Sequence, residues 1–165
     1  MRHLISVLLE NETGALSRVV GLFSQRGFNI ESLTVAPTED PTLSRMTITT
    51  FCDEQEVEQI TKQLHKLINV LKVTDLCDSS HVEREIMLVK IEAATRDLRS
   101  EIKTMSDIFH GQIVDLTPTL YTVEIIGSSE ELDHFLEAVT KVTEIIEVVR
   151  SGVCGISRGE RSLRL

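Results

Sequence analysis

The strongest constraint on the fold is a repeat: the same order of strand-like and helix-like segments, recognised by the spacing of their apolar residues, occurs twice along the chain. In the first half, four short apolar or β-branched runs accompany two segments in which apolar residues recur at helical spacing. The runs are residues 4–9, 32–36, 45–51 and 70–74, and the helical segments are residues 15–26 and 57–68. Residues 1–76 are therefore predicted to form β-α-β-β-α-β.

The second half repeats this order, although few of its residues match those of the first half. Its strand-like runs are residues 85–91, 112–116, 121–125 and 145–149, and its helical stripes are residues 98–109 and 132–139. Ser128 and Glu131 have the spacing of a capping box, which predicts the start of the second of these helices. A short polar stretch, residues 77–81, separates the two halves.

The predicted fold class is α+β, with two ferredoxin-like βαββαβ domains in tandem. The expected domains are residues 1–76 and residues 82–165, joined by a linker at residues 77–81. Right-handed crossovers place both helices on one face of a four-stranded antiparallel sheet and leave the other face bare. A domain of about 75 residues has a marginal core. We therefore expect a homodimer, with the N-terminal sheets joined side by side.

The first helix is predicted from residues 15–26. The residues expected to share its buried face are Leu16, Val19, Val20 and Phe23. Thr13 is a suitable N-cap, Arg26 suits the helix dipole in the last turn, and Gly27 is a natural stop. A strand is expected to start at Phe28.

Gly14 lies in the turn that opens this helix. A glycine allows the backbone to approach a ligand closely, and a helix N-terminus offers free N–H groups and a positive dipole end. The turn is therefore a candidate site for a small carboxylate. By itself the pattern is equally compatible with an ordinary strand-turn-helix connection.

Composition excludes several classes of function. The net charge is −9 without a long basic block, and there is no Trp and one Tyr, so nucleic-acid binding is not expected. No apolar run approaches the ~20 residues of a membrane span, and the first strand begins too early for a targeting peptide. We expect a cytoplasmic protein. Arginines near the C-terminus indicate either a solvated tail or a docking tail for an acidic partner: Arg150, Arg158, Arg161 and Arg164.

The three cysteines, Cys52, Cys77 and Cys154, are far apart in sequence and form no C-x-x-C pair. Zinc and redox sites therefore lose their main support, and no metal site is predicted. Reduced thiols are expected.

Several segments resemble the regulatory small subunit of acetolactate synthase, also called acetohydroxyacid synthase. In the first half they are residues 3–19, 26–35 and 44–48, and in the second half residues 82–90 and 150–152. The resemblance covers essentially the whole chain. It implies that the N-terminal domain is an ACT domain, a ferredoxin-like module that binds amino acids at domain interfaces.

The resemblance also implies a function. In this family a separate catalytic large subunit carries thiamine diphosphate, Mg and FAD, and makes the first common step toward valine, leucine and isoleucine. The small subunit has no catalytic centre and binds none of these cofactors. It raises the activity of its partner and confers feedback inhibition, usually by valine.

The resemblance places the effector between two protomers of the ACT dimer. One protomer is expected to contribute Asn11, Gly14 and Ala15, and the other Asn29 and Ile30. The N–H groups around Gly14 and Ala15 can bind a carboxylate, the asparagine amides can hold the charged groups, and Ile30 can line a pocket for a branched side chain. From the residues alone, a turn-forming role is favoured for both asparagines.

Two other classes of function are weighed against this one. An enzyme in its own right would need a catalytic motif, and none of the common hydrolase, metalloprotease, P-loop or dinucleotide patterns occurs. His65 and His134 are expected on helix surfaces, and Glu130-Glu131 at a helix start. A free-standing amino-acid-sensing regulator with ACT domains is the alternative that the resemblance leaves open.

Overall fold

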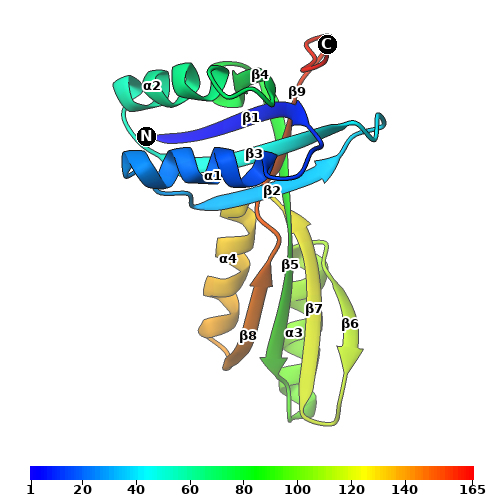
Figure 1. Cartoon of the computed structure of the whole chain (residues 1–165). Helices are drawn as coiled ribbons and strands as arrows, with labels where there is room; N and C mark the ends of the chain where they lie inside the picture. The colour runs from blue at the N-terminus through cyan, green and yellow to red at the C-terminus, as the bar shows by residue number, and fades with distance from the viewer. The chain divides into compact units, whose positions relative to one another are not determined.

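The computed structural model describes all residues, 1–165. Contacts divide the chain into two units, which are drawn in Figure 1. The first unit contains residues Met1–Glu83 and Val153–Leu165, and the second contains Arg84–Gly152. This grouping differs from the predicted domains, because the last thirteen residues belong with the first unit rather than the second.

The first unit is a four-stranded antiparallel sheet with two helices on one face (Figure 1). Its strands follow the order β2-β3-β1-β4. Its elements are β1 (Arg2–Glu10), α1 (Ala15–Arg26), β2 (Ser32–Pro37), β3 (Leu43–Phe51), α2 (Glu54–His65) and β4 (Val70–Asp75). Alternate residues of β1, such as Val7, pack against helix residues such as Phe23 and Leu64 to form the core. The predicted ferredoxin-like arrangement is confirmed.

The second unit has the equivalent strand order, β6-β7-β5-β8. Its elements are β5 (His81–Glu92), whose first three residues belong to the first unit, α3 (Arg96–Ile108), β6 (Gln112–Leu116), β7 (Leu120–Gly127), α4 (Ser129–Thr140) and β8 (Ile145–Arg150). The predicted capping box is present, since Ser128 accepts from the Glu131 N–H and Glu131 accepts from the Ser128 N–H. In the core, the rings of Phe109 and Phe135 pack edge to face, with their centroids 5.4 Å apart.

The segment predicted as a linker is ordered. A short 3-10 turn, η1 (Leu76–Asp78), follows β4, and β5 begins at His81. Leu76 is fully buried, and the Asp75 carboxylate accepts from the Cys77 N–H at 2.9 Å. The polar stretch therefore contains a tight turn that is held by a side-chain cap.

The helix-free face of the first sheet was expected to be bare, and this expectation is wrong. The segment around β9 (Cys154–Ser157) packs against that face. Thr34 Oγ1 donates to the Val153 carbonyl at 3.0 Å, and Val153 forms a buried cluster with Leu4 and Leu76. A Cβ on Gly155 would lie 2.7 Å from Leu76 Cδ1 and 3.0 Å from Leu4 Cδ2, so a larger residue would displace these two buried side chains. The four-residue strand has too short a pattern to be recognised from sequence.

Three local predictions around α1 need correction. The N-cap is Gly14 rather than Thr13, and the helix buries Ala15, Val19 and Phe23, while Leu16 is 40% exposed. These three buried residues are spaced four apart and form a narrow row along α1, whereas the predicted buried face was wider. At the other end Gly27 stops the helix as predicted.

The strand after α1 starts at Ser32, not at Phe28. The Phe28 N–H bonds to the Phe23 carbonyl, so this residue completes the helix C-cap and is unavailable to a strand. Likewise the second helical segment was expected to extend to Ile68, but α2 ends at His65 and Ile68 is 84% exposed.

Arg150 was expected to belong to a basic tail, but it lies at the end of β8 in an ion pair. Its guanidinium donates to the almost fully buried carboxylate of Glu85 at 3.0 and 3.1 Å, and this carboxylate raises the pKa of Arg150. Ser129 also donates to Glu85, at 3.1 Å. The pair fixes the return of the chain at the end of the second sheet.

Candidate functional site

The turn between β1 and α1 leaves backbone donors without acceptors. Gly14 is the N-cap, with φ +87° and ψ −8°, and provides no side chain to cap the helix. The Ala15 N–H bonds back to Glu12, but the N–H groups of Leu16 and Ser17 have no protein acceptor. The first turn of α1 contains no acidic residue. The positive end of the helix is therefore open to an anion.

Arg18 adds a full positive charge to this turn. Its guanidinium lies 3.5 Å from the position that a Cβ on Gly14 would occupy. The Asn69 side-chain oxygen accepts from Arg18 Nη1 at 2.5 Å and orients the group. Asn69 is itself buried, with 5% of its surface exposed. Neither Arg18 nor Asn69 was identified from the sequence.

Negative groups lie beside the same turn. Asn69 Nδ2 donates to Glu10 Oε2 at 3.1 Å and to Glu12 Oε2 at 3.4 Å. One buried amide thus connects two carboxylates with the Arg18 guanidinium. A zwitterionic ligand needs a positive partner for its carboxylate and a negative or neutral acceptor for its ammonium group. Both kinds of partner are present around Gly14.

Asn11 lies at the edge of this turn, and the amide nitrogen of its side chain is hydrogen-bonded within the protein. Its Nδ2 donates to the Pro41 carbonyl at 3.0 Å, and its backbone N–H bonds to Thr42 at 2.7 Å. The side-chain oxygen has no donor in this structure and can accept a hydrogen bond from an ammonium group. Of the predicted site residues, the structure brings Asn11, Gly14 and Ala15 together.

Asn29 and Ile30 lie beyond the opposite end of α1. The helix has twelve residues, which corresponds to about 18 Å of axial rise. Asn29 is exposed, and its carbonyl accepts from Thr50 Oγ1 at 2.6 Å. Ile30 is half-buried against the core. A single chain therefore does not bring these two residues to Gly14.

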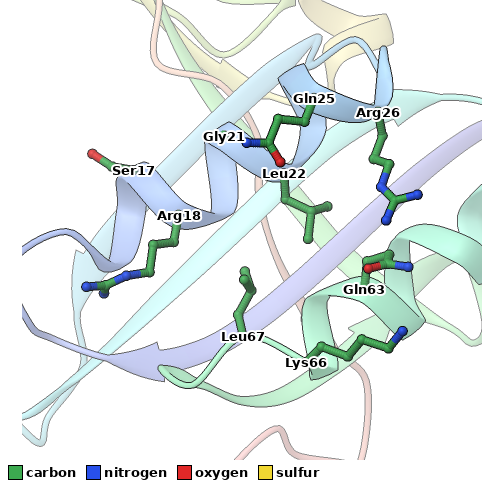
Figure 2. Close-up of a pocket in the computed structure, with 9 residues that line it drawn as sticks. All are labelled: Ser17, Arg18, Gly21, Leu22, Gln25, Arg26, Gln63, Lys66 and Leu67. Atoms are coloured by element: carbon green, nitrogen blue, oxygen red, sulfur yellow. The ribbon is translucent and has the colours of Figure 1, made fainter.

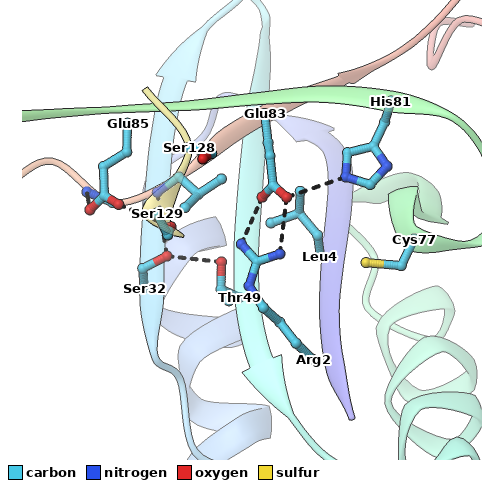
Figure 3. A network of polar contacts seen from close by, with 12 residues as sticks. Arg2, Leu4, Ser32, Thr49, Cys77, His81, Glu83, Glu85, Ser128 and Ser129 are labelled. Carbon is cyan, nitrogen blue, oxygen red and sulfur yellow. Dashed lines mark hydrogen bonds and ion pairs between the residues drawn. The ribbon is translucent and has the colours of Figure 1, made fainter. Parts of the chain in front are cut away.

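A second group of charges, shown in Figure 3, is engaged in internal pairs. The Arg2 guanidinium donates to both oxygens of Glu83, at 3.1 and 2.6 Å, and His81 Nε2 lies 3.6 Å from the same carboxylate. Partial burial raises the pKa of Glu83, but the hydrogen bonds and charge of Arg2 outweigh it and hold the pKa below its usual value. This arrangement explains local stability rather than catalysis.

No group of three or more His, Cys, Asp or Glu side chains is placed to hold a metal ion. His65 and His134 are exposed on helices as predicted, and Glu131 serves in the α4 capping box. No helix has the length and apolarity needed to cross a membrane.

Comparison with known families accounts for both units. A family model described as "AHAS small subunit-like ACT domain" matches residues 5–72, and one described as "Small subunit of acetolactate synthase" matches residues 84–159. The chain belongs to the acetolactate synthase small-subunit family. The Gly14 turn lies within the residues that match the ACT-domain model.

Relatives of the acetolactate synthase small-subunit family match over the full chain. The isozyme 3 small subunit of Salmonella typhimurium is 63% identical over 164 residues, covering 99% of this chain and 100% of the relative. The small subunit of Haemophilus influenzae is 58% identical, with 99% coverage of both. The crystal structure of the Thermotoga maritima small subunit superposes with a TM-score of 0.86 at 35% identity, covering 98% of this chain and 99% of that one.

Proposed function

We propose that this chain is a regulatory subunit that activates a separate catalytic chain and confers feedback inhibition by valine. The observation that carries the proposal is the uncapped Gly14 turn with Arg18 beside it, in a chain that matches the small-subunit family along its length. The catalytic subunit supplies thiamine diphosphate, Mg and FAD, whereas this chain binds none of them. The complex works in the cytoplasm.

The effector site is built by two chains. In this proposal β2, which is an edge strand with an exposed C-terminal half, pairs antiparallel with β2 of a second copy. A two-fold axis through that pairing brings the N-terminal end of one α1 to the C-terminal end of the other. Gly14 of one protomer then faces Asn29 and Ile30 of its partner. This arrangement accounts for two sets of site residues at opposite ends of one helix.

Each group at this site has a defined task. The free N–H groups of Leu16 and Ser17 and the Arg18 guanidinium bind the effector carboxylate. Asn11 from the same chain and Asn29 from the other accept from the ammonium group. Ile30 supplies an apolar wall for the branched side chain, and Ala15 keeps the turn narrow.

Reconstitution tests the proposal. The purified chain is mixed with an acetolactate synthase catalytic subunit, and pyruvate turnover is measured with and without the chain during a valine titration. The expected result is higher turnover with the chain and inhibition by valine only when the chain is present. A chain that turns over pyruvate alone would be an enzyme, and one that neither binds nor activates the catalytic subunit would be a free-standing regulator. Either result would overturn the proposal.

A further inference from the structure

A surface cleft of about 390 Å³ lies between α1 and α2, as Figure 2 shows. It follows the two helices on the face that the sheet does not cover. Leu22 and Leu67 are both half-buried and give the cleft an apolar floor. A Cβ on Gly21 would meet no atom within 4 Å, so this mid-helix glycine leaves the middle of the cleft open.

The charged side chains around the cleft all have one sign. They are Arg18, Arg26 and Lys66, and no acidic residue lines the cleft. Arg18 is held by Asn69, while Arg26 and Lys66 form no ion pair and no side-chain hydrogen bond. The chain as a whole has a net charge of −9. A cluster of unneutralised cations in so acidic a chain indicates a negatively charged occupant.

The spacing of these cations favours a peptide segment over a small anion. Arg18 and Arg26 are eight residues apart on α1, about 12 Å along the helix axis. One phosphate or carboxylate cannot reach both. Two amide side chains, Gln25 and Gln63, also line the cleft and can exchange hydrogen bonds with a peptide backbone. The leucine floor accepts the apolar face of such a segment.

We infer that this cleft binds an acidic, amphipathic segment of the catalytic subunit. The inference rests on the function proposed above. The cleft lies between the helices, whereas the proposed dimer forms along β2, so both surfaces can be occupied together. Arg18 borders both the cleft and the Gly14 turn. An effector carboxylate and a partner carboxylate thus draw on one guanidinium, which couples the two binding events.

The first test reverses the charge of the cleft with the double variant Arg26→Glu/Lys66→Glu. Both side chains are exposed, so the fold is expected to persist, and thermal unfolding checks this. Its affinity for the catalytic subunit, measured by titration calorimetry at about 0.1 M salt, is expected to fall at least about tenfold. The matched control is Arg96→Glu/Lys141→Glu, the same change at exposed positions of the second unit. Its affinity is expected to match the unmodified chain.

A second pair of variants closes the cleft without changing charge. Gly21→Leu places a side chain in the open space and is expected to weaken binding about tenfold, whereas Gly21→Ala is expected to bind normally. Suppose that the unmodified chain binds the catalytic subunit and that Arg26→Glu/Lys66→Glu and Gly21→Leu both bind it with the same affinity. The inference is then overturned, while the subunit function stands. Loss of self-association instead would identify a second copy as the occupant and would also overturn it. Failure of the unmodified chain to bind overturns both proposals.

Discussion

The turn after the first strand of each unit occupies the same place in the fold, yet the helix that follows it begins differently. In the second unit Thr95 caps α3, and its hydroxyl accepts from the Leu98 N–H at 3.2 Å. In the first unit Gly14 stands at the equivalent position and caps nothing. One helix end is capped by its own side chain, whereas the other has no side-chain cap.

The arginine four residues after each cap shows the same contrast. Arg99 donates to the Ala93 carbonyl at 2.8 Å and to the Thr117 carbonyl, and its guanidinium lies 4.7 Å from the centre of the Tyr121 ring. Its charge is used inside the second unit. Arg18 makes one bond, to Asn69 Oδ1, and lies beside the open turn. The same position therefore serves packing in the second unit and lies beside an uncapped helix end in the first.

The helix-free faces of the two sheets also differ. In the first unit, Val153 covers Leu4 and is itself 3% exposed. In the second unit the equivalent face carries Ile86, Leu88 and Ile126, which are 38%, 40% and 58% exposed. The C-terminal segment thus completes the core of the unit that contains the candidate site.

The largest expected effect is on effector binding through Gly14→Asp. The new carboxylate fills the turn and neutralises Arg18, so the valine concentration for half inhibition is expected to rise about a hundredfold, about 2.7 kcal/mol. The positive φ of Gly14 adds roughly 1 kcal/mol of strain, so stability falls modestly while activation of the catalytic subunit persists. Valine titration of the reconstituted enzyme measures this. An unchanged inhibition curve, or joint loss of activation and inhibition, would contradict the assignment.

The contrast between the covered and open faces is tested by Val153→Ala. Removing this buried side chain is expected to lower the free energy of unfolding by about 2 kcal/mol. The control Ile126→Ala removes an exposed side chain from the second sheet and is expected to change it by less than about 0.5 kcal/mol. Urea unfolding measures the free energy of unfolding of both variants. Equal losses of this free energy would show that the segment around β9 adds nothing to the core of the first unit.

Substitution of Arg18 and of Arg99 is expected to affect different properties, valine binding for the first and stability for the second. Arg18→Gln is expected to weaken valine binding to the free small subunit about tenfold, about 1.4 kcal/mol, because a charge-assisted hydrogen bond is lost. Arg99→Gln is expected to leave valine affinity unchanged and to destabilise the second unit. Calorimetric titration and thermal unfolding of the two proteins distinguish these effects. Equal valine affinity in both would remove Arg18 from the site.

Apart from the control variants, the smallest expected change comes from Thr95→Ala. Loss of the α3 cap is expected to lower stability by about 1 kcal/mol and to leave valine inhibition intact. Thermal unfolding and the inhibition curve are compared with those of the unmodified chain. A change in valine response would mean that the second turn takes part in effector binding.

The order of strands and helices along the chain could be predicted because it depends on local patterns. Met46 and Ile48 alternate with threonines, which is typical of a strand. The Ser128–Glu131 spacing is typical of a helix start. The arrangement around Gly14 could be predicted only in part. Asn69 lies 51 residues from Arg18 and meets it only through the folded sheet, so no local pattern records their bond.

The cover over the first sheet could not be predicted for a related reason. β9 is four residues long, and its place depends on the small size of Gly155 against Leu76. Such a close approach is a property of two distant segments. Hydrophobic spacing reports which face of an element is buried, but not which segment buries it.

The central claim, an effector site shared by two chains, is tested most directly with mixed dimers. Gly14→Asp and the bulky Asn29→Phe each disable both sites of their own homodimer. When the two variants are co-expressed, a shared site predicts that every mixed dimer regains one intact site, formed by Gly14 of one chain and Asn29 of the other. Valine binding by calorimetry should then return with unmodified affinity and about a quarter of the unmodified stoichiometry. No recovery of valine binding in the mixed dimers would contradict a site shared between chains.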